Sequence, residues 1–197
     1  MNAIVMAAGN GTRLGTATRH RPKCLLHVGG KPMLEWWLDS LFGCRCFSMV
    51  SVNLHHLADA VEEWLASYEG RHQDGREVAR IDERTGLLGT AGTLYWHGEP
   101  TEDVFIAYAD TFSVRAFEEI PLFVEEWKRL RETGAGAVAA LLTFDPPQDG
   151  SSGTLTVDRD GWVTSFAEKD SAGDRAWAGM MFAGPEIYSY LWKADRD

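Results

Sequence analysis

The fold of this chain is decided first by residues 3–26, AIVMAAGNGTRLGTATRHRPKCLL. An apolar segment, residues 3–7, runs directly into a loop that contains three glycines and closes on Pro22 and Lys23. Glycine permits positive φ and a close approach of the backbone to a ligand, and successive backbone N–H groups in such a loop bind anions. Four cations lie within eleven residues of a chain whose net charge is -10: Arg13, Arg19, Arg21 and Lys23. The segment therefore predicts a phosphate site after a buried strand.

Two common glycine loops do not fit this segment. A Walker A loop needs G-x-x-x-x-G-K-[ST], but Lys31, which follows Gly30, is followed by Pro32. A dinucleotide fingerprint needs G-x-G-x-x-G, and Leu14 stands where its third glycine is required. The loop is thus of another kind.

The segment resembles the opening of the sugar-phosphate nucleotidyltransferases, the NDP-sugar pyrophosphorylases, and among them the mannose-1-phosphate guanylyltransferases. Their G-x-G-T-R-L and P-K-x-L-L pattern is matched by AAGNGTRL (residues 7–14), PKCLLHV (residues 22–28) and residues 30–32. Ala8 replaces the first of the usual glycines, and residues 15–18 replace the usual P-L-T. The resemblance implies that the nucleotide binds to Ala7, Ala8, Gly9, Asn10, Gly11 and Thr12. It implies catalytic roles for Arg13 and Lys23 at the triphosphate, whereas Arg19 and Arg21 fit a surface position equally well.

Two further segments match the family at the nucleotide side. Residues 88–93, LGTAGT, resemble its L-G-T-A-G stretch, which implies that Gly89 and Thr90 lie against the base and ribose. A capped helix start, with Thr90 as the cap, is the alternative. Asp110 follows an apolar strand, where the resemblance implies a catalytic carboxylate that binds Mg²⁺, the expected cofactor. Capping of the next segment is the alternative for Asp110.

The acceptor side is indicated by residues 166–169, FAEK, which resemble the family's F-x-E-K. This implies contacts of Glu168 and Lys169 with the sugar phosphate, although an exposed ion pair is the alternative. Gly153 and Gly179 resemble glycines that contact the sugar, but Trp177 stands where the family has Asn.

The carboxyl end departs from the family pattern. The expected G-x-W-x-D-x-G-T segment, which supplies a second metal carboxylate, has no match, so the chain is read as C-terminally short. After Gly179 it offers Glu186, Asp195 and Asp197. The metal is then held by Asp110 with phosphates and water, or by Asp195, Asp197 or another subunit as well.

The remaining sequence predicts an α/β fold: a Rossmann-like, mostly parallel sheet with helices on both faces and a small β-hairpin in the sugar-binding region. We expect strands at residues 2–7, 47–53, 78–81, 103–109, 135–144 and 176–183, and a hairpin at residues 154–157 and 162–166. We expect helices at residues 32–42, 57–68 and 120–133, and a short one from residue 185.

Length and composition, with 45% hydrophobic residues, predict a single domain over residues 1–197, and the resemblance implies that it is a nucleotidyltransferase domain. A pI near 5.0 argues against binding to nucleic acid or to an anionic membrane. Cys24, Cys44 and Cys46 match no zinc template, so we expect reduced thiols and a cytoplasmic protein. A homo-oligomer is left open.

The function expected from the resemblance is transfer of a nucleotidyl group from an NTP to a sugar 1-phosphate, giving an NDP-sugar and pyrophosphate. The L-G-T-A-G form favours GTP. Transfer to another phosphate, such as phosphocholine, and a non-catalytic nucleotide-binding subunit are the alternatives.

Overall fold

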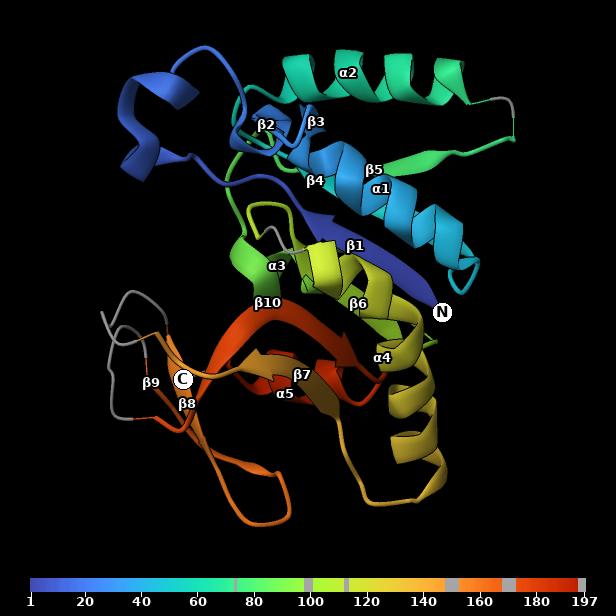
Figure 1. Cartoon of the computed structure of the whole chain (residues 1–197), viewed down its shortest axis with the longest axis vertical. Helices are drawn as coiled ribbons and strands as arrows, with labels where there is room; N and C mark the ends of the chain where they lie inside the picture. The colour runs from blue at the N-terminus through green and yellow to red at the C-terminus, as the bar shows by residue number, and fades with distance from the viewer. Residues whose placement is uncertain (73, 98–100, 112–113, 148–152, 168–172, 195–197) are drawn as a thin grey trace.

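Four parallel strands form one side of the sheet, in the order β5–β4–β1–β6 with β5 at the edge (Figure 1). They are β1 (Asn2–Met6), β4 (Met49–Leu54), β5 (Val78–Asp82) and β6 (Val104–Tyr108). The structure is a computed structural model that describes residues 1–72, 74–97, 101–111, 114–147, 153–167 and 173–194, without the side chains of residues 13, 97, 114–116 and 192–194. In β1, Ala3, Ile4 and Val5 have no exposed surface, as expected of a strand covered on both faces.

Antiparallel strands extend this sheet beyond β6. They are β10 (Arg175–Ala183), β7 (Ala139–Phe144), β8 (Thr154–Val157) and β9 (Val163–Ala167). β10 pairs with β6, β7 and β8, and β9 pairs with β8. The predicted strand at residues 135–144 thus lies outside the parallel set. The predicted fold class is confirmed: a mixed α/β fold with a mainly parallel central sheet flanked by helices.

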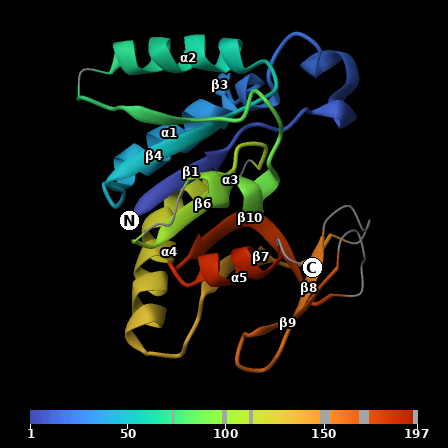
Figure 2. The same cartoon turned by 180° about the vertical axis from the view of Figure 1, so that it is seen from behind.

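Helices cover both faces of the sheet. They are α1 (Met33–Cys44), α2 (Ala58–Arg71), α3 (Gly89–His97), α4 (Val114–Glu132) and α5 (Ile187–Ala194). The segment between β1 and α1 contains two short helices, η1 (Thr12–Thr18) and η2 (Lys23–Leu25), and two short strands, β2 (His27–Val28) and β3 (Lys31–Pro32). Ala3 and Val5 pack in the core formed with α1, α2 and α4, whereas Ile4 and Met6 pack with α3 and α5. Figure 1 has α1 and α4 in front of the sheet, and Figure 2 brings α3 and α5 forward. Over the described residues, no helix combines the length and the apolar character that crossing a lipid bilayer requires.

Helix α4 begins earlier than the sequence predicts. The expected start is Ile120, but the helix runs from Val114 to Glu132 with Pro121 inside it. Phe117, Ile120, Val124 and Trp127 are all buried, at the spacing of one helix face. Packing of this continuous apolar face offsets the hydrogen bond that proline removes.

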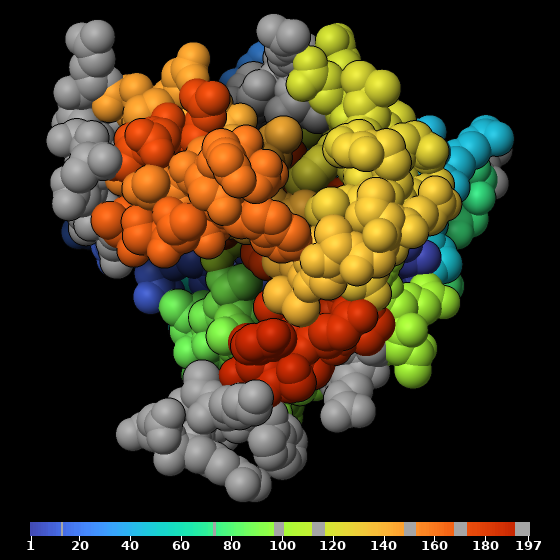
Figure 3. All heavy atoms as spheres, turned by 90° about the horizontal axis from the view of Figure 1, so that it is seen from below, coloured from blue at the N-terminus to red at the C-terminus, as the bar shows by residue number. Residues whose placement is uncertain are grey.

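The β8–β9 hairpin is confirmed where the sequence places it. Asp158 Oδ1 accepts hydrogen bonds from the backbone N–H groups of Asp160 and Trp162, both at 2.9 Å, which closes the turn. Seen from below, the surface is hollowed between this hairpin and the segment that follows α4 (Figure 3). This hollow, about 780 Å³, is lined mainly by β7 and the hairpin.

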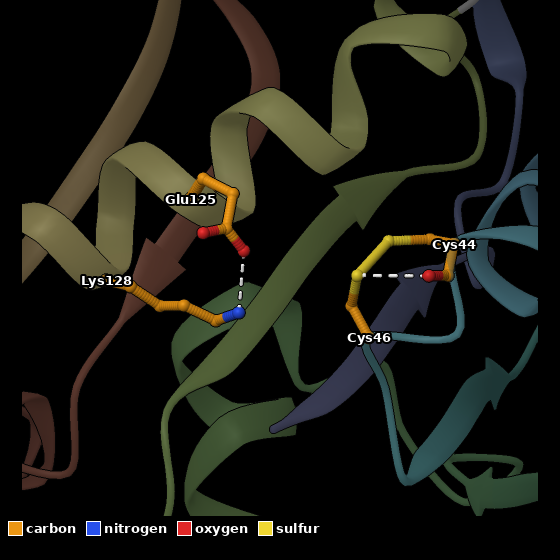
Figure 4. Close-up of a disulfide and its surroundings, with 4 residues drawn as sticks. All are labelled: Cys44, Cys46, Glu125 and Lys128. Carbon is orange, nitrogen blue, oxygen red and sulfur yellow. Dashed lines mark hydrogen bonds and ion pairs between the residues drawn. A yellow bond between two sulfur atoms is a disulfide. The ribbon is translucent and has the colours of Figure 1, made fainter.

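The cysteine expectation is wrong in one respect. Cys44 and Cys46 form a disulfide at the end of α1 (Figure 4), and Cys24 is a buried free thiol. Arg45 between them adopts a left-handed conformation with φ 55°, and the two Cα atoms lie 5.3 Å apart. That separation lies within the range of disulfides, which sequence spacing alone does not reveal.

Candidate active site

The glycine loop leaves the end of β1 and is fixed at both of its ends. The N–H groups of Ala7 and Ala8 donate to Asn53 Oδ1, at 2.6 and 3.0 Å. At the far end, Thr18 Oγ1 donates to the carbonyl of Gly11 at 2.9 Å. Gly11 has φ +62°, and a Cβ there would lie 2.8 Å from the Thr18 side chain. Only glycine fits this position, since both the backbone conformation and the space exclude a side chain.

Two predicted catalytic side chains meet across the fold. Lys23, at the start of η2, and Asp110, directly after β6, form an ion pair of 2.6 Å between Nζ and Oδ2. The two side chains are 29% and 43% exposed, so both charges remain accessible from solvent. The structure thus places one cation and one carboxylate at the carboxyl ends of the parallel strands, where open α/β sheets bind ligands.

A cavity of about 220 Å³ lies beside this pair. Its lining is Met6, Ala7, Ala8, Gly9, Lys23, Cys24, Asn53, Leu87, Gly89, Thr90, Tyr108, Ala109 and Asp110. It therefore brings together seven residues that the sequence singles out: Ala7, Ala8, Gly9, Lys23, Gly89, Thr90 and Asp110. Asn10, Gly11 and Thr12 lie further along the loop and do not line the cavity, and the side chain of Arg13 is outside the described part of the chain.

The second wall of the cavity is the start of α3. Gly89 has φ +69°, which lets the chain turn into the helix at this point. Thr90 lies inside α3 and its hydroxyl hydrogen-bonds the hydroxyl of Tyr108, so the capping alternative for Thr90 does not describe the structure. This contact joins α3 to the end of β6, next to Asp110.

The predicted acceptor side is only partly described. Glu168 and Lys169 fall outside the described residues, and Gly153 lies beside Phe166 at the start of the hairpin. Gly179 has φ +71°, and a Cβ there would lie 2.5 Å from Thr111 Oγ1. Here too, the backbone and the space both require glycine.

An aromatic surface occupies the position where the family has an amide. The Trp177 ring lies edge-on to the rings of Tyr108 and Phe166, with centroids 5.1 and 6.4 Å away. Its Nε1–H donates to the carbonyl of Met180 at 3.0 Å, which fixes the ring. Trp177 therefore presents an apolar ring beside the cavity, and its only polar group already has a partner.

Several residues at the cavity were not singled out from the sequence. They are Met6, Cys24, Asn53, Leu87, Tyr108 and Ala109. Of these, Asn53 could have been recognised from the sequence, because it is a polar residue at the end of the apolar run FSMVSVN. Cys24 is 2% exposed, and burial raises the pKa of its thiol to about 12. It is thus a neutral thiol at neutral pH.

The donor set for a divalent cation is small. Among the described residues, no group of three or more His, Cys, Asp and Glu side chains could hold a metal ion. Asp110 is the carboxylate of the cavity lining. One carboxylate with substrate phosphates and water is a donor set that Mg²⁺ accepts, so Asp110 fits this ion only together with the nucleotide.

The family of the chain follows from a comparison with known domains. Residues 3–142 match the MobA-like NTP transferase domain. The chain belongs to this family, which confirms the resemblance to nucleotidyltransferases read from the opening loop.

Named relatives cover nearly the whole chain. It is 28% identical to the UTP–glucose-1-phosphate uridylyltransferase of Synechocystis sp., over 97% of the chain and 51% of that protein. It is also 28% identical to the glucose-1-phosphate thymidylyltransferase of Streptomyces griseus, over 95% of the chain and 50% of that protein. The chain thus spans about half the length of these relatives.

A solved structure supports the fold. UDP-glucose pyrophosphorylase in complex with UDP-glucose superposes with a TM-score of 0.77 at 14% identity, over 98% of this chain and 79% of that chain. At this identity the likeness shows the fold alone.

Proposed function

We propose that the protein transfers a nucleotidyl group from an NTP to a sugar 1-phosphate, giving an NDP-sugar and pyrophosphate. One observation supports this most directly: the glycine loop, Lys23, Asp110 and the start of α3 line a single cavity. Family membership and the names of the relatives point to the same reaction.

The chemistry needs charge neutralisation more than it needs a nucleophile from the protein. In the proposed reaction, an oxygen of the acceptor phosphate attacks the α-phosphorus in line, and pyrophosphate leaves. Attack of one anion on another is slow unless cations offset the growing charge. Lys23 supplies one such cation at the cavity, and Arg13 is proposed as a second.

Asp110 is proposed to hold Mg²⁺ together with the nucleotide phosphates. When bound, this ion would supply further neutralisation of the triphosphate. Lys23 Nζ lies 2.6 Å from the Asp110 carboxylate, and a carboxylate engaged by the ion would leave this ammonium free to bind the phosphates. The backbone N–H groups of the glycine loop are proposed to orient the triphosphate.

The base and the sugar are finer proposals. The L-G-T-A-G form favours GTP, whereas the two named relatives are a uridylyltransferase and a thymidylyltransferase. Trp177 supports an acceptor that packs an apolar face on an aromatic ring, because its N–H is already bonded to Met180.

Pyrophosphate release tests the proposal. The protein is incubated with Mg²⁺, one of UTP, dTTP, CTP, GTP or ATP, and a panel of sugar 1-phosphates and phosphocholine. We expect release with one base and one sugar 1-phosphate, and its loss in Asp110→Asn. Release with phosphocholine alone would favour the other acceptor, and NTP binding by calorimetry without any release would favour a non-catalytic subunit.

A further inference from the structure

A buried carboxylate lies behind the cavity, at Glu83. Its side chain follows β5, and the residue is 1% exposed. Its described partners are neutral donors: Asn53 Nδ2 at 3.1 Å, the hydroxyl of Thr93, and the N–H of Leu88 at 3.3 Å. A carboxylate is costly to bury, and both oxygens of this one are used as acceptors.

The first connection runs from Glu83 to the glycine loop through Asn53. Asn53 is 4% exposed at the end of β4, and its Oδ1 accepts the N–H groups of Ala7 and Ala8. These two donors require the oxygen of the amide on their side, so the Nδ2 group must face Glu83. Ala7 and Ala8 on one side and Glu83 Oε1 on the other therefore hold the Asn53 amide in the same orientation.

The second connection runs from Glu83 to the opposite wall. Oε2 accepts the N–H of Leu88, the residue before Gly89. Oε1 accepts the hydroxyl of Thr93, one turn into α3. Ala7, Ala8, Gly9, Gly89 and Thr90 all line the cavity, so a single buried side chain joins both of its walls.

We propose that Glu83 is a positioning residue, which acts through Asn53 and Leu88 to hold the glycine loop and the start of α3 at the separation that the nucleotide needs. The inference deepens the proposed function and rests on it for the identity of the ligand. Glu83 is not among the residues that line the cavity, so it does not act by touching the substrate.

Position 83 requires a carboxylate because both of its side-chain oxygens accept hydrogen bonds, one from Asn53 and one from Leu88. Glutamine at position 83 offers one oxygen, so it faces either Asn53 Nδ2 or the N–H of Leu88 with a donor. Aspartate at position 53 still accepts from Ala7 and Ala8, but its second oxygen then faces Glu83 Oε1 at the 3.1 Å contact. Each single exchange therefore leaves a buried mismatch.

The reciprocal double exchange removes both mismatches. In Asn53→Asp with Glu83→Gln, aspartate accepts from Ala7 and Ala8, and the glutamine amide donates to its second oxygen. The glutamine oxygen then accepts the N–H of Leu88, and the Thr93 hydroxyl, which lies 2.8 Å from the carbonyl of Gly89, donates there and accepts from the glutamine amide. The proposal thus predicts rescue by the double variant, because a donor–acceptor pair is reversed and not lost.

The experiment combines steady-state kinetics with amide hydrogen exchange of the free protein. In Glu83→Gln and in Asn53→Asp we expect the KM for the NTP to rise about tenfold or more, with little change in the KM for the acceptor. Exchange is expected to be faster at residues 7–9 and 87–90. The double variant is expected to return to within about threefold of the native KM, with native exchange.

Tyr68→Phe is the matched control for loss of stability alone. Tyr68 is buried, and its hydroxyl bonds Asp39 at 3.0 Å, outside the cavity lining. We expect a lower Tm and an unchanged KM for the NTP. An equal KM change in this variant would show a general stability effect and overturn the proposal.

Two other outcomes overturn it: single variants with native KM and native exchange, or a double variant with additive defects. If a single variant does not fold, the double variant decides, since the proposal requires it to fold and to bind the NTP as the native protein does. If the native protein neither binds nor uses any NTP, the proposed function fails, while the exchange measurements still test the link from Glu83 to both walls.

Discussion

Lys23 and Asp110 are 87 residues apart in the sequence, yet their charged atoms lie 2.6 Å apart. Both side chains are partly exposed, and an exposed ion pair stabilises a fold by about 1 kcal/mol or less. Their contact is thus of little use to the fold. The position of both residues in the cavity lining is the basis for their proposed functional role.

Replacement of either residue is expected to reduce activity without unfolding the protein. For Lys23→Met and Asp110→Asn we expect kcat to fall roughly 10²- to 10³-fold, because the first removes a cation beside the phosphates and the second removes the carboxylate proposed to hold Mg²⁺. Turnover and Tm are the measurements. The control is Lys128→Met, which breaks the exposed 2.7 Å pair with Glu125 on α4 (Figure 4) and should leave both unchanged. Activity above one third of native in both site variants would contradict the assignment.

The cysteines differ in reactivity for a structural reason. Burial raises the pKa of Cys24 to about 12, so only on the order of 10⁻⁴ of this thiol is ionised at pH 8. We expect no alkylation of the native protein, one alkylated thiol after unfolding, and three after unfolding with reduction. Mass spectrometry gives the count, and more than one alkylated thiol without reduction would contradict the Cys44–Cys46 disulfide.

At the scale of elements, the irregularity in β10 connects the sheet to the site. The register of β10 against β7 shifts between Trp177 and Met181, and Gly179 lies in that interval with φ +71°. Thr111, which a Cβ at Gly179 would strike, follows Asp110 directly. The backbone of β10 thus limits where the end of β6 can lie.

Gly179→Ala is therefore expected to affect stability and activity together. We expect a loss of about 1 to 3 kcal/mol in the free energy of unfolding, and a lower kcat through the shift of Asp110. Urea unfolding and turnover measure the two effects. Gly70→Ala in α2 is the control, since nothing lies within 4 Å of its added Cβ, and it should stabilise by about 0.5 to 1 kcal/mol. A neutral Gly179→Ala would show that the segment adapts.

An ion pair connects α2 to β5 and predicts a dependence on pH. Glu69 accepts Arg80 NH1 at 2.7 Å and NH2 at 2.9 Å, and these bonds lower the pKa of Glu69. The stabilisation is present above the unfolded pKa, about 4.3, and is lost as the pH falls through the lower folded pKa. Glu69→Gln should lower the free energy of unfolding by about 1 to 2 kcal/mol at pH 7, and by less as the pH falls from 5 to 3. Urea unfolding across this pH range measures the free energy of unfolding of both proteins. Glu63→Gln, at an exposed position, is the control. A difference between Glu69→Gln and the native protein that does not change with pH would contradict the prediction.

At the scale of the whole molecule, the cavity is built from segments that start far apart in the chain. Residues 6–9, 23–24, 53, 87, 89–90 and 108–110 all contribute to it. A ligand that contacts several of these segments binds the folded state and not the unfolded chain, so it stabilises the whole fold.

The correct nucleotide is therefore expected to raise the Tm. At a concentration of about 100 times Kd, the gain is about 2.7 kcal/mol, or roughly 5–10 °C for a chain of this size. Thermal scans with each NTP and Mg²⁺ would rank the bases, and Lys23→Met should reduce the shift. If no NTP at millimolar concentration moves the Tm, nucleotide binding at this cavity is refuted.

The sequence by itself determined the succession of the main strands and helices along the chain, the hairpin at Asp158, and the family. These depend on local patterns: apolar runs, turn residues, and a loop motif whose glycines and cations are contiguous. It also singled out seven of the cavity residues, because motif residues at the ends of parallel strands share one edge of the sheet.

Only the tertiary structure decided the rest. It placed β7 antiparallel beside β10, closed the Cys44–Cys46 disulfide, and set the Trp177 ring against Tyr108. It also joined Asn53 and Glu83, two polar residues 30 positions apart with no motif of their own. Such contacts depend on which strands lie side by side and on which buried donors need acceptors. No local sequence pattern predicts either of these conditions.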